Sequence, residues 1–349
     1  MQLVDSAHLS PKLFRKTITL APTRDGYGQG LVEVGKQNPN VVVLCCDLTE
    51  STRSNLFAEK FPDRFIEVGV AEQNMAGIAA GLALHGKVPF MSSYAVFSPG
   101  RNWDQCRVSI CYNSANVKIA GAHAGISVGP DGATHQALED LAITRVLPGM
   151  TVVVPCDAIE AQKATVAAAK MRGPVYLRFA REKTPVFTTA KTPFRIGRVA
   201  LLTAGVDVSI IACGSLVYQS LLAAKELAKQ KMSAQVINCH TLKPLDGNNL
   251  LRFVKATGAI VTVEEHQIHG GLRGAIAEYF SAVYPVPIRS VGMPDRFGES
   301  GEPEELLEKY GITVERIVEE SLRAIRMKSL KHKRNDTFAR SSRKKRSAE

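Results

Sequence analysis

Residues 64–85 read RFIEVGVAEQNMAGIAAGLALH: a short apolar run, a glycine turn and a longer run of mostly small or apolar residues. The first run has the length of a strand, so we predict a strand over 64–68. The longer run predicts a helix over 72–85. A strand that passes through a short turn into a helix is the repeating unit of parallel sheets with crossover helices.

The same alternation of short apolar runs and helix-like stretches recurs on both sides of this unit. The predicted strands are 41–46, 64–68, 88–92, 117–122, 151–154 and 175–178, and the predicted helices are 26–38, 72–85, 99–112, 135–147 and 158–171. This order predicts an α/β domain with a doubly wound parallel sheet.

A polar stretch between two Lys-Thr-Pro triplets, at 183–185 and 191–193, is typical of a linker. We therefore place one domain at 1–185, a linker at 186–192 and a second, smaller α/β domain at 193–327. In the second domain the predicted strands are 208–212, 234–238, 259–263 and 286–290, and the predicted helices are 217–230, 248–256, 272–284, 303–310 and 313–327.

Composition limits the class of protein. The chain has 349 residues, 45% of them hydrophobic and 22% charged, which suits two globular domains. It contains neither a run of roughly 18 apolar residues, which a membrane helix needs, nor a secretory signal. Its seven cysteines form no Cys-x-x-Cys pair, which favours a reducing compartment. We expect a soluble cytoplasmic protein.

Much of the formal net charge of +11 lies at the C-terminal end. Residues 328–349 hold nine lysines or arginines against two acidic residues, with Leu330 and Phe338 as the large apolar side chains. Such a segment cannot bury enough apolar surface to fold alone, so we predict a basic disordered tail. Attraction of RNA or an acidic partner surface by this charge run stays open as an alternative.

Glu72 stands where the predicted strand passes into the predicted helix. One interpretation is structural, since the positive end of a helix dipole favours a carboxylate by roughly 0.3–1 kcal/mol. The other is catalytic, because the helix is apolar on nearly every face. Such a helix indicates burial, and a buried glutamate has a raised pKa and can hold a proton for general acid work. The residues alone leave both interpretations open.

Two further segments follow predicted strands. Tyr94 and Phe97 lie in a loop, where two aromatics three apart form one wall of a site or simply pack. Residues 123–136 read HAGISVGPDGATHQ, with two histidines and an aspartate among glycines. Ligands of parallel α/β folds gather at the carboxyl ends of strands, so this loop faces the expected crevice. Asp131 and Thr134 also suit helix capping.

These segments resemble the transketolase family, most closely its C-terminal half, over residues 12–327. The stretch VAEQNM at 70–75 is similar to the motif whose glutamate meets the aminopyrimidine of thiamine diphosphate. The resemblance implies a thiamine-diphosphate-binding fold, with a pyrimidine-binding domain followed by a transketolase C-terminal-type domain. It implies that Glu72 is catalytic and hydrogen-bonds a ring nitrogen of the cofactor, which acts as an electron sink. The other implied cofactor contacts are Phe97 as the stacking ring, Tyr94 and Asp47.

The resemblance also assigns substrate contacts. Arg24 and Arg181 match positions that grip a sugar phosphate, with Ser51 as a hydroxyl partner, and a guanidinium offers a planar fork for phosphate oxygens. Asp131 and His135 match contacts to the hydroxyls near the donor carbonyl. His123 matches a contact near the acceptor end, and His135 is implied as a catalytic proton shuttle, since imidazole titrates near neutrality.

Magnesium is expected to come with a partner chain. Related enzymes bind the diphosphate through Mg²⁺ with Gly-Asp-Gly and a later Asn, and this sequence contains no Gly-Asp-Gly. The resemblance therefore implies an N-terminal partner subunit that holds the metal, no metal ligand in this chain, and a heterotetramer. The His-x-x-His pair His266 and His269 offers only two ligands, so we interpret it as a polar loop between the domains.

We therefore predict one subunit of a transketolase (EC 2.2.1.1) of the pentose phosphate pathway, which transfers a two-carbon ketol unit from a ketose phosphate to an aldose phosphate. An alternative in the same superfamily is a 1-deoxyxylulose-5-phosphate synthase or the β subunit of an oxo-acid dehydrogenase. The segment Thr-His-Gln at 134–136, followed by Glu139, is more similar to transketolase. An alternative of another class is a non-catalytic binding module whose basic tail attracts nucleic acid.

Overall fold

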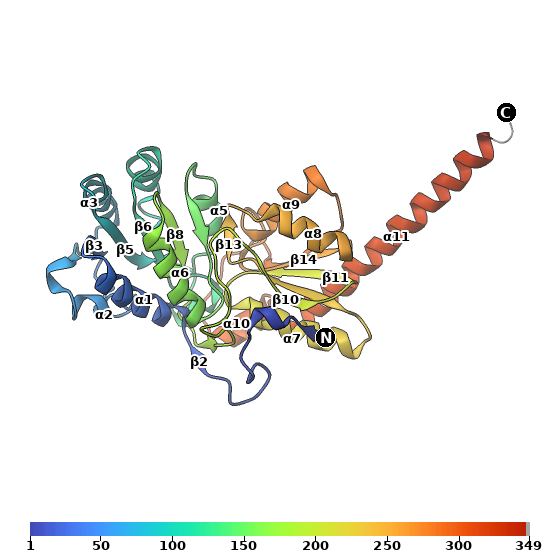
Figure 1. Cartoon of the computed structure of the whole chain (residues 1–349), viewed down its shortest axis with the longest axis horizontal. Helices are drawn as coiled ribbons and strands as arrows, with labels where there is room; N and C mark the ends of the chain where they lie inside the picture. Colours follow the sequence, from blue (N-terminus) through green and yellow to red (C-terminus); the bar gives the residue numbers. More distant parts are fainter. Residues whose placement is uncertain (347–349) are drawn as a thin grey trace.

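The computed structural model describes the backbone of residues 1–346 and the side chains of residues 1–330. Its described part is built around two main sheets, one in each domain (Figure 1). The first sheet has the order β13-β7-β8-β6-β5-β3-β4, in which every neighbouring pair except β13 with β7 is parallel. Its strands are β3 (Val41–Cys45), β4 (Phe65–Glu67), β5 (Val88–Tyr94), β6 (Lys118–Ala122), β7 (Thr151–Val153), β8 (Val175–Arg178) and β13 (Thr241–Lys243). The predicted doubly wound parallel sheet is confirmed.

Helices cover both faces of this sheet. On one face α1 (Thr23–Gln37) packs against α6 (Ala158–Lys170), and α2 (Asn55–Ala58) lies beside α1. A Cβ atom at Gly30 would stand 2.6 Å from the Thr165 side chain, so only glycine permits this close helix contact. On the other face lies α3 (Glu72–Leu84) beside a distorted segment, α4 (Trp103–Gln105) followed by the π-helical η3 (Cys106–Tyr112).

The second sheet has the order β1-β10-β12-β11-β14-β15. Its strands are β1 (Gln2–Leu3), β10 (Ala200–Ala204), β11 (Val208–Ala212), β12 (Ala234–Asn238), β14 (Ile260–Gln267) and β15 (Ile288–Met293). The helices of this domain are α7 (Leu216–Lys229), α8 (Gly247–Thr257), α9 (Leu272–Val283), α10 (Pro303–Lys309) and α11 (Val314–Arg346). The predicted strands and helices of the second domain are all present, with small shifts at their ends except for the last helix, α11, which extends well beyond the predicted residue 327.

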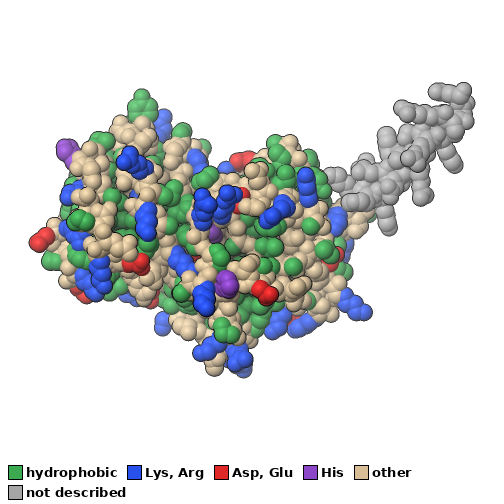
Figure 2. All heavy atoms as spheres, viewed as in Figure 1, with side chains coloured by type: hydrophobic (Ala, Val, Ile, Leu, Met, Phe, Trp, Pro, Cys, Tyr) green, Lys and Arg blue, Asp and Glu red, His purple; other side chains and the backbone are tan. Residues whose placement is uncertain are grey.

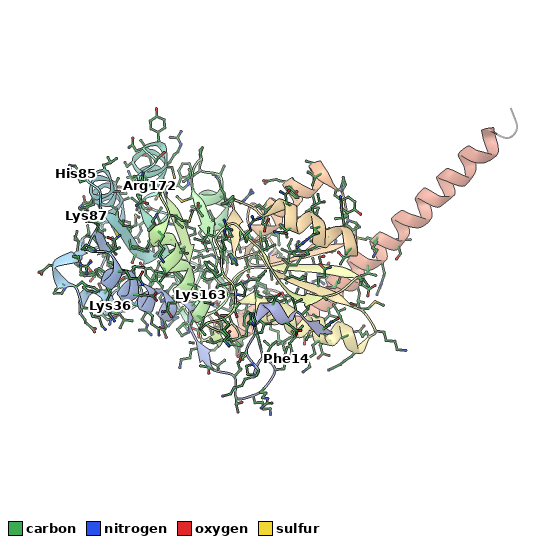
Figure 3. All side chains as sticks on the ribbon, viewed as in Figure 1. Phe14, Lys36, His85, Lys87, Lys163 and Arg172 are labelled. Atoms are coloured by element: carbon green, nitrogen blue, oxygen red, sulfur yellow. The ribbon has the colours of Figure 1, made fainter. Side chains whose placement is uncertain are left out.

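Both domains exchange segments of chain. The strand β13 belongs to the second domain in sequence but pairs with β7 of the first sheet. Conversely, β1 at the N-terminus pairs with β10, so the first residues lie on the second domain and not on the first as we predicted. Phe14, labelled in Figure 3, continues this contact, with Lys225 Nζ of α7 at 4.9 Å from its ring centroid. The two domains are therefore interlocked at more than one place.

The linker is held against the first domain. Lys163 on α6, labelled in Figure 3, donates hydrogen bonds from Nζ to the carbonyl oxygens of Thr189 and Thr192 at 2.7 and 2.6 Å. A small antiparallel pair, β2 (Leu20–Ala21) with β9 (Thr184–Pro185), joins the start of the first domain to its end. These contacts fix the path of the chain between the two domains.

Three predicted elements differ from the structure. The helix expected over 135–147 is reduced to α5 (Asp140–Arg145), and the loop before it contains the 3₁₀-helix η4 (Ile126–Asp131), where glycine and proline suit tight turns. The helix expected over 99–112 begins only at Trp103. The helix α11 continues to Arg346, past the point near 327 where we expected the folded part to end. Lysine, arginine and alanine favour helix, and neither glycine nor proline occurs between 314 and 346. Residues 347–349 of the predicted tail lie outside the described residues.

The surface and the core fit the composition. All seven cysteines are buried and free, which agrees with their place in apolar runs. On the face drawn in Figure 2, basic and apolar side chains are interspersed over both domains. No helix in the described part of the chain is both long and apolar enough to cross a membrane.

Candidate active site

Polar side chains gather at the carboxyl ends of the first sheet. Asp47 follows β3, Glu72 begins the helix after β4, Tyr94 ends β5, His123 follows β6, and Arg181 comes soon after β8. Asp47 and His123 have positive φ angles of 57° and 52°, an uncommon conformation for residues other than glycine. Strained residues of this kind cluster at functional sites, so the backbone itself points to this edge of the sheet.

Glu72 is the first residue of α3, and 4% of its surface is exposed. Its carboxylate accepts hydrogen bonds from Nη1 of Arg101 on both oxygens, at 3.1 and 3.2 Å. Its backbone carbonyl accepts from Nδ2 of the buried Asn102 at 3.1 Å. The carboxylate is therefore buried against the protein on most sides and meets one partly exposed side chain, since Arg101 is 48% exposed.

Arg101 is a site residue that sequence reasoning missed. Its guanidinium carbon lies 3.8 Å from the centroid of the Phe97 ring, and its backbone N–H donates to the carbonyl of Phe97 at 2.8 Å. The cation therefore lies between the ring of Phe97 and the carboxylate of Glu72. Residues 95–102 form turns and not a regular helix, so no helical spacing in the sequence indicated this contact.

Four rings meet beside this pair. Tyr94 stacks on the imidazole of His123 with centroids 3.9 Å apart, and on the ring of Phe97 at 5.8 Å. His135 turns its edge to Phe97 at 5.3 Å. The structure thus brings together five of the predicted residues, from three different segments of the chain: Glu72, Tyr94, Phe97, His123 and His135.

His123 forms the floor of the cluster. It is buried, and its Nε2 lies 3.1 Å from Nη1 of Arg24. Burial and the nearby charges of Arg24 and Arg181 lower the pKa of His123 to about 3. Arginine only donates, so Nε2 is the acceptor and the proton of the neutral ring lies on Nδ1. Nδ1 of His123 and Nε of Arg24 are buried without a hydrogen-bond partner among the described residues.

Arg24 and Arg181 lie near His123. Arg24 donates to the backbone carbonyl of Ser51 at 2.8 Å, which brings the predicted phosphate-binding residues Arg24 and Ser51 together. Arg181 donates to the carbonyl of Val128 at 2.6 Å and lies 3.5 Å from the carboxylate of Asp131. Asp131 and Arg181 thus form a partly exposed pair at the mouth of the site.

Asp47 does not join the cluster through its side chain. It is exposed, and its backbone N–H donates to Oε1 of Glu67 at 2.7 Å. Glu67 also accepts from Oγ1 of Thr49 and from the backbone of Gly69. The carboxylate of Glu67, which sequence reasoning did not single out, therefore organises the turns after β3 and β4.

His266 faces the first domain but lies in strand β14, and not in the polar loop that we predicted for the His-x-x-His segment. Its ring is fully buried, with Nε2 3.4 Å from the backbone nitrogen of Ala142 on α5. His269 is exposed. The pair is thus divided between an interior and a surface position.

Family comparisons agree with this geometry. Residues 20–186 match the family described as transketolase, pyrimidine binding domain, and residues 197–317 match transketolase, C-terminal domain. The chain belongs to the transketolase family. The pyrimidine-binding domain implies dependence on thiamine diphosphate, and it contains Glu72 and the ring cluster described above.

Relatives within the transketolase family have a similar extent. The chain is 42% identical over 297 residues to a putative transketolase C-terminal section from Methanocaldococcus jannaschii, covering 84% of this chain and 93% of that one. It is 42% identical to a 6-deoxy-6-sulfo-D-fructose transketolase subunit from Clostridium sp. (strain MSTE9), over 84% and 92% of the two chains. A solved split-gene transketolase, an inactive β4 tetramer, superposes with a TM-score of 0.83 at 46% identity, over 88% of this chain and 99% of that one. The chain therefore resembles single subunits of split transketolases.

Proposed function

We propose that this chain is the C-terminal subunit of a transketolase that moves a two-carbon ketol unit from a ketose phosphate to an aldose phosphate. In this proposal it uses thiamine diphosphate and works only with an N-terminal partner subunit. The observation that carries the proposal is the arrangement of Glu72 and Phe97, because a buried carboxylate and a ring face converge on one planar group.

Arg101 shows what this arrangement can hold. The guanidinium is flat, carries N–H donors and lies between the ring of Phe97 and both oxygens of Glu72. An aminopyrimidine is also flat and also presents nitrogen atoms at its edge, so it matches the same two partners. The residues present therefore fit the pyrimidine end of thiamine diphosphate, provided that Arg101 moves aside.

Each residue of the cluster has a distinct task in this proposal. When bound, thiamine diphosphate supplies the electron sink for breaking the bond next to the ketose carbonyl. Glu72 holds a proton at its carboxyl against a ring nitrogen, shielded from water by its burial. Phe97 holds the ring by stacking, and Tyr94 supports Phe97 and His123 from behind. Asp47 contributes through the turn that Glu67 organises.

The sugar contacts follow from the same geometry. Neutral His123 presents its Nδ1–H as a donor, and the Nε–H of Arg24 is a second buried donor. Both suit the hydroxyl or phosphate oxygens of a sugar phosphate. Arg181 and Asp131 form a partly exposed pair, and His135, whose ring lies beside that of Phe97, is proposed to exchange protons with a substrate bound next to the cofactor. The Nδ1 of His135 lies 2.9 Å from Oγ1 of Thr134, which orients the ring.

The proposal assigns Mg²⁺ and the diphosphate to the partner subunit, in a heterotetramer with the cofactor between chains. The sequence without Gly-Asp-Gly supports this division. The related structure described as an inactive β4 tetramer is consistent with it, because a tetramer of one kind of subunit would lack the other half of each site. Cytoplasmic location remains part of the proposal, and the buried free cysteines favour a reducing compartment.

The test is reconstitution with a diphosphate-binding partner. The chain is mixed with a Gly-Asp-Gly-containing transketolase half, thiamine diphosphate and Mg²⁺, and transfer from xylulose 5-phosphate to ribose 5-phosphate is followed. We expect turnover only when both polypeptides are present. Release of carbon dioxide from pyruvate, without transfer between sugars, would instead assign the chain to the synthase or dehydrogenase branch.

A further inference from the structure

The glycine-rich loop 123–136 is held from the second domain. The backbone N–H of Ser127, in the first turn of η4, donates to Oε1 of Glu265 at 2.6 Å. Glu265 lies on β14 and is 5% exposed. A Cβ atom at Gly125 would stand 2.2 Å from the same carboxylate oxygen, so the loop backbone lies directly against this side chain. The contact joins residues 138 positions apart in the sequence.

A second contact holds the other end of the loop. Nε2 of the buried Gln136 lies 2.9 Å from the carbonyl of Glu299 in the second domain, and 3.2 and 3.3 Å from the carbonyls of Ile126 and Gly129 within the loop. A Cβ atom at Gly132 would stand 2.5 Å from Oγ of Ser300. The loop is thus enclosed between its own sheet and two segments of the second domain.

Glu265 is itself fixed in place. Its backbone carbonyl accepts from Nη2 of Arg178 at 2.9 Å, and the same nitrogen donates to the carbonyl of Ala137 at 3.1 Å. Arg178 in turn forms a buried ion pair with Asp140. A carboxylate that is anchored through its own backbone can position the group it binds, because neither partner is free to move.

The loop carries three residues that the proposed reaction needs. His123 precedes Gly125 by two positions, and Asp131 and His135 follow Ser127. The rings of His123 and His135 contact Tyr94 and Phe97. A shift of η4 would therefore move the histidines relative to the rings. Displacement of about 1 Å at such groups costs on the order of 100-fold in rate.

We propose that Glu265 is a positioning residue: from the C-terminal domain it fixes the loop 123–136 and so sets the place of His123, Asp131 and His135 toward the sugar substrate. This inference rests on the proposed function for its effect on turnover. It does not rest on that function for its effect on the loop. Through the loop, it gives the second domain an indirect part in substrate binding.

Glu264 offers a matched control on the same strand. It is equally buried and also accepts from backbone N–H groups, those of Leu272 and Arg273 at the start of α9, at 2.6 and 2.7 Å. Replacing either glutamate removes a buried acceptor and leaves backbone donors unpaired. Only Glu265 touches the loop. A general loss of stability therefore appears in both variants, whereas an effect on the loop separates them.

The experiment compares Glu265→Ala, Glu265→Asp, Glu265→Gln and Glu264→Ala in the complex with the partner subunit. Hydrogen exchange of the amides in 125–136 is measured first, because it needs no turnover. We expect about tenfold or faster exchange there in Glu265→Ala and Glu265→Asp. In Glu265→Gln, whose amide oxygen still accepts from Ser127, and in Glu264→Ala, we expect exchange at the wild-type rate.

Steady-state kinetics then measure the effect on the sugars. We expect kcat/KM for the ketose phosphate to fall about 10- to 100-fold in Glu265→Ala, mainly through KM, with the dissociation constant of thiamine diphosphate unchanged within about threefold. Glu265→Gln should recover most of this loss. Unchanged loop exchange in Glu265→Ala, or the same kinetic loss in Glu264→Ala, would overturn the inference. A wild-type complex without sugar transfer would overturn the proposed function, while the exchange data would still decide whether Glu265 holds the loop.

Discussion

Two arginine–carboxylate pairs in this molecule have the same chemistry and opposite surroundings. Arg178 and Asp140, at the interface of the two domains, are 6% and 1% exposed. Arg178 donates to both oxygens of Asp140 at 2.8 and 3.1 Å, and the hydroxyl of Tyr176 donates to one of them at 2.6 Å. Arg101 and Glu72, in the candidate site, are 48% and 4% exposed.

The two pairs differ in whether the arginine side chain is enclosed by the protein. Burial raises the pKa of Asp140, but the charge and hydrogen bonds of Arg178 outweigh this and lower it. Both partners of that pair are enclosed, so removing one leaves a buried charge alone. In the other pair only the carboxylate is enclosed, because about half of the Arg101 side chain is exposed to solvent. We call Arg178 with Asp140 the closed pair and Arg101 with Glu72 the open pair. The closed pair joins the domains. In the open pair, the carboxylate of Glu72 can exchange Arg101 for another partner.

The largest expected effect is on the closed pair. Replacing Asp140 with Ala should lower the free energy of unfolding by about 3–5 kcal/mol, because Arg178 keeps its charge without a partner. Urea denaturation of the purified chain measures this value. As a control, Arg101→Ala should lower the free energy of unfolding much less than Asp140→Ala does. Equal losses in the two variants would show that exposure does not distinguish the pairs.

Glu72→Gln tests the open pair on activity. The amide keeps the size of the side chain but cannot hold an acidic proton, so kcat in the reconstituted complex should fall by about 100-fold or more. The unfolding free energy should change by only about 1 kcal/mol, since an exposed arginine is its partner. Full turnover in this variant would remove Glu72 from the chemistry and favour the structural interpretation of a helix-start carboxylate.

The pKa of His123 reports whether water reaches the floor of the site, below the open pair. Its pKa is 6.5 as a free side chain and about 3 here, through burial first and the arginine charges second. Between these two pH values the imidazole of His123 binds a proton in the unfolded chain but not in the folded chain. The free energy of unfolding therefore falls as the pH decreases below 6.5.

The measurement compares wild type with His123→Asn by urea denaturation at pH 7 and pH 5. The wild type should lose up to about 2 kcal/mol more than the variant over this interval, from 1.4 kcal/mol for each pH unit. Equal losses in both proteins would mean that the imidazole is accessible to water and that the floor of the site is open.

The smallest expected effect is that of Arg101. If its guanidinium occupies the place of the pyrimidine ring, Arg101→Ala should bind thiamine diphosphate a few times more tightly in the complex, as measured by calorimetry. Its stability should change by less than about 1 kcal/mol. Arg101→Lys keeps the charge but not the planar fork, so its affinity for thiamine diphosphate should lie between those of the wild type and Arg101→Ala. Weaker cofactor binding in Arg101→Ala would show that the arginine assists the cofactor.

Local patterns were enough for most elements. The run Val41–Cys45 is entirely apolar and entirely buried, as a central parallel strand must be, and the helix from Glu72 begins where the sequence indicated. The prediction was wrong for the helix expected from His135, because glycine and proline upstream turn the chain and the helix begins only at Asp140. Short segments such as β13 were missed, since a strand of that length has no periodicity of its own.

The composition of the site was partly predictable and its contacts were not. Glu72, Tyr94, Phe97, His123 and His135 follow predicted strands of a parallel sheet, whose ends meet at one edge, but the resemblance to the transketolase family was needed to assign their roles. Arg101 lay in a segment without a distinctive pattern. Its place was decided by the Phe97 ring below it and the Glu72 carboxylate beside it, which are contacts across the fold.

The sequence by itself determined the alternation of strands and helices, the family, and the residue types gathered at the sheet edge, because these depend on neighbours a few positions apart. Only the tertiary structure decided which carboxylate is closed and which is open, and which domain holds the loop 123–136. Burial and hydrogen bonding depend on groups far apart in the chain, as Glu265 and Ser127 show. Their energies arise only when the two domains pack together.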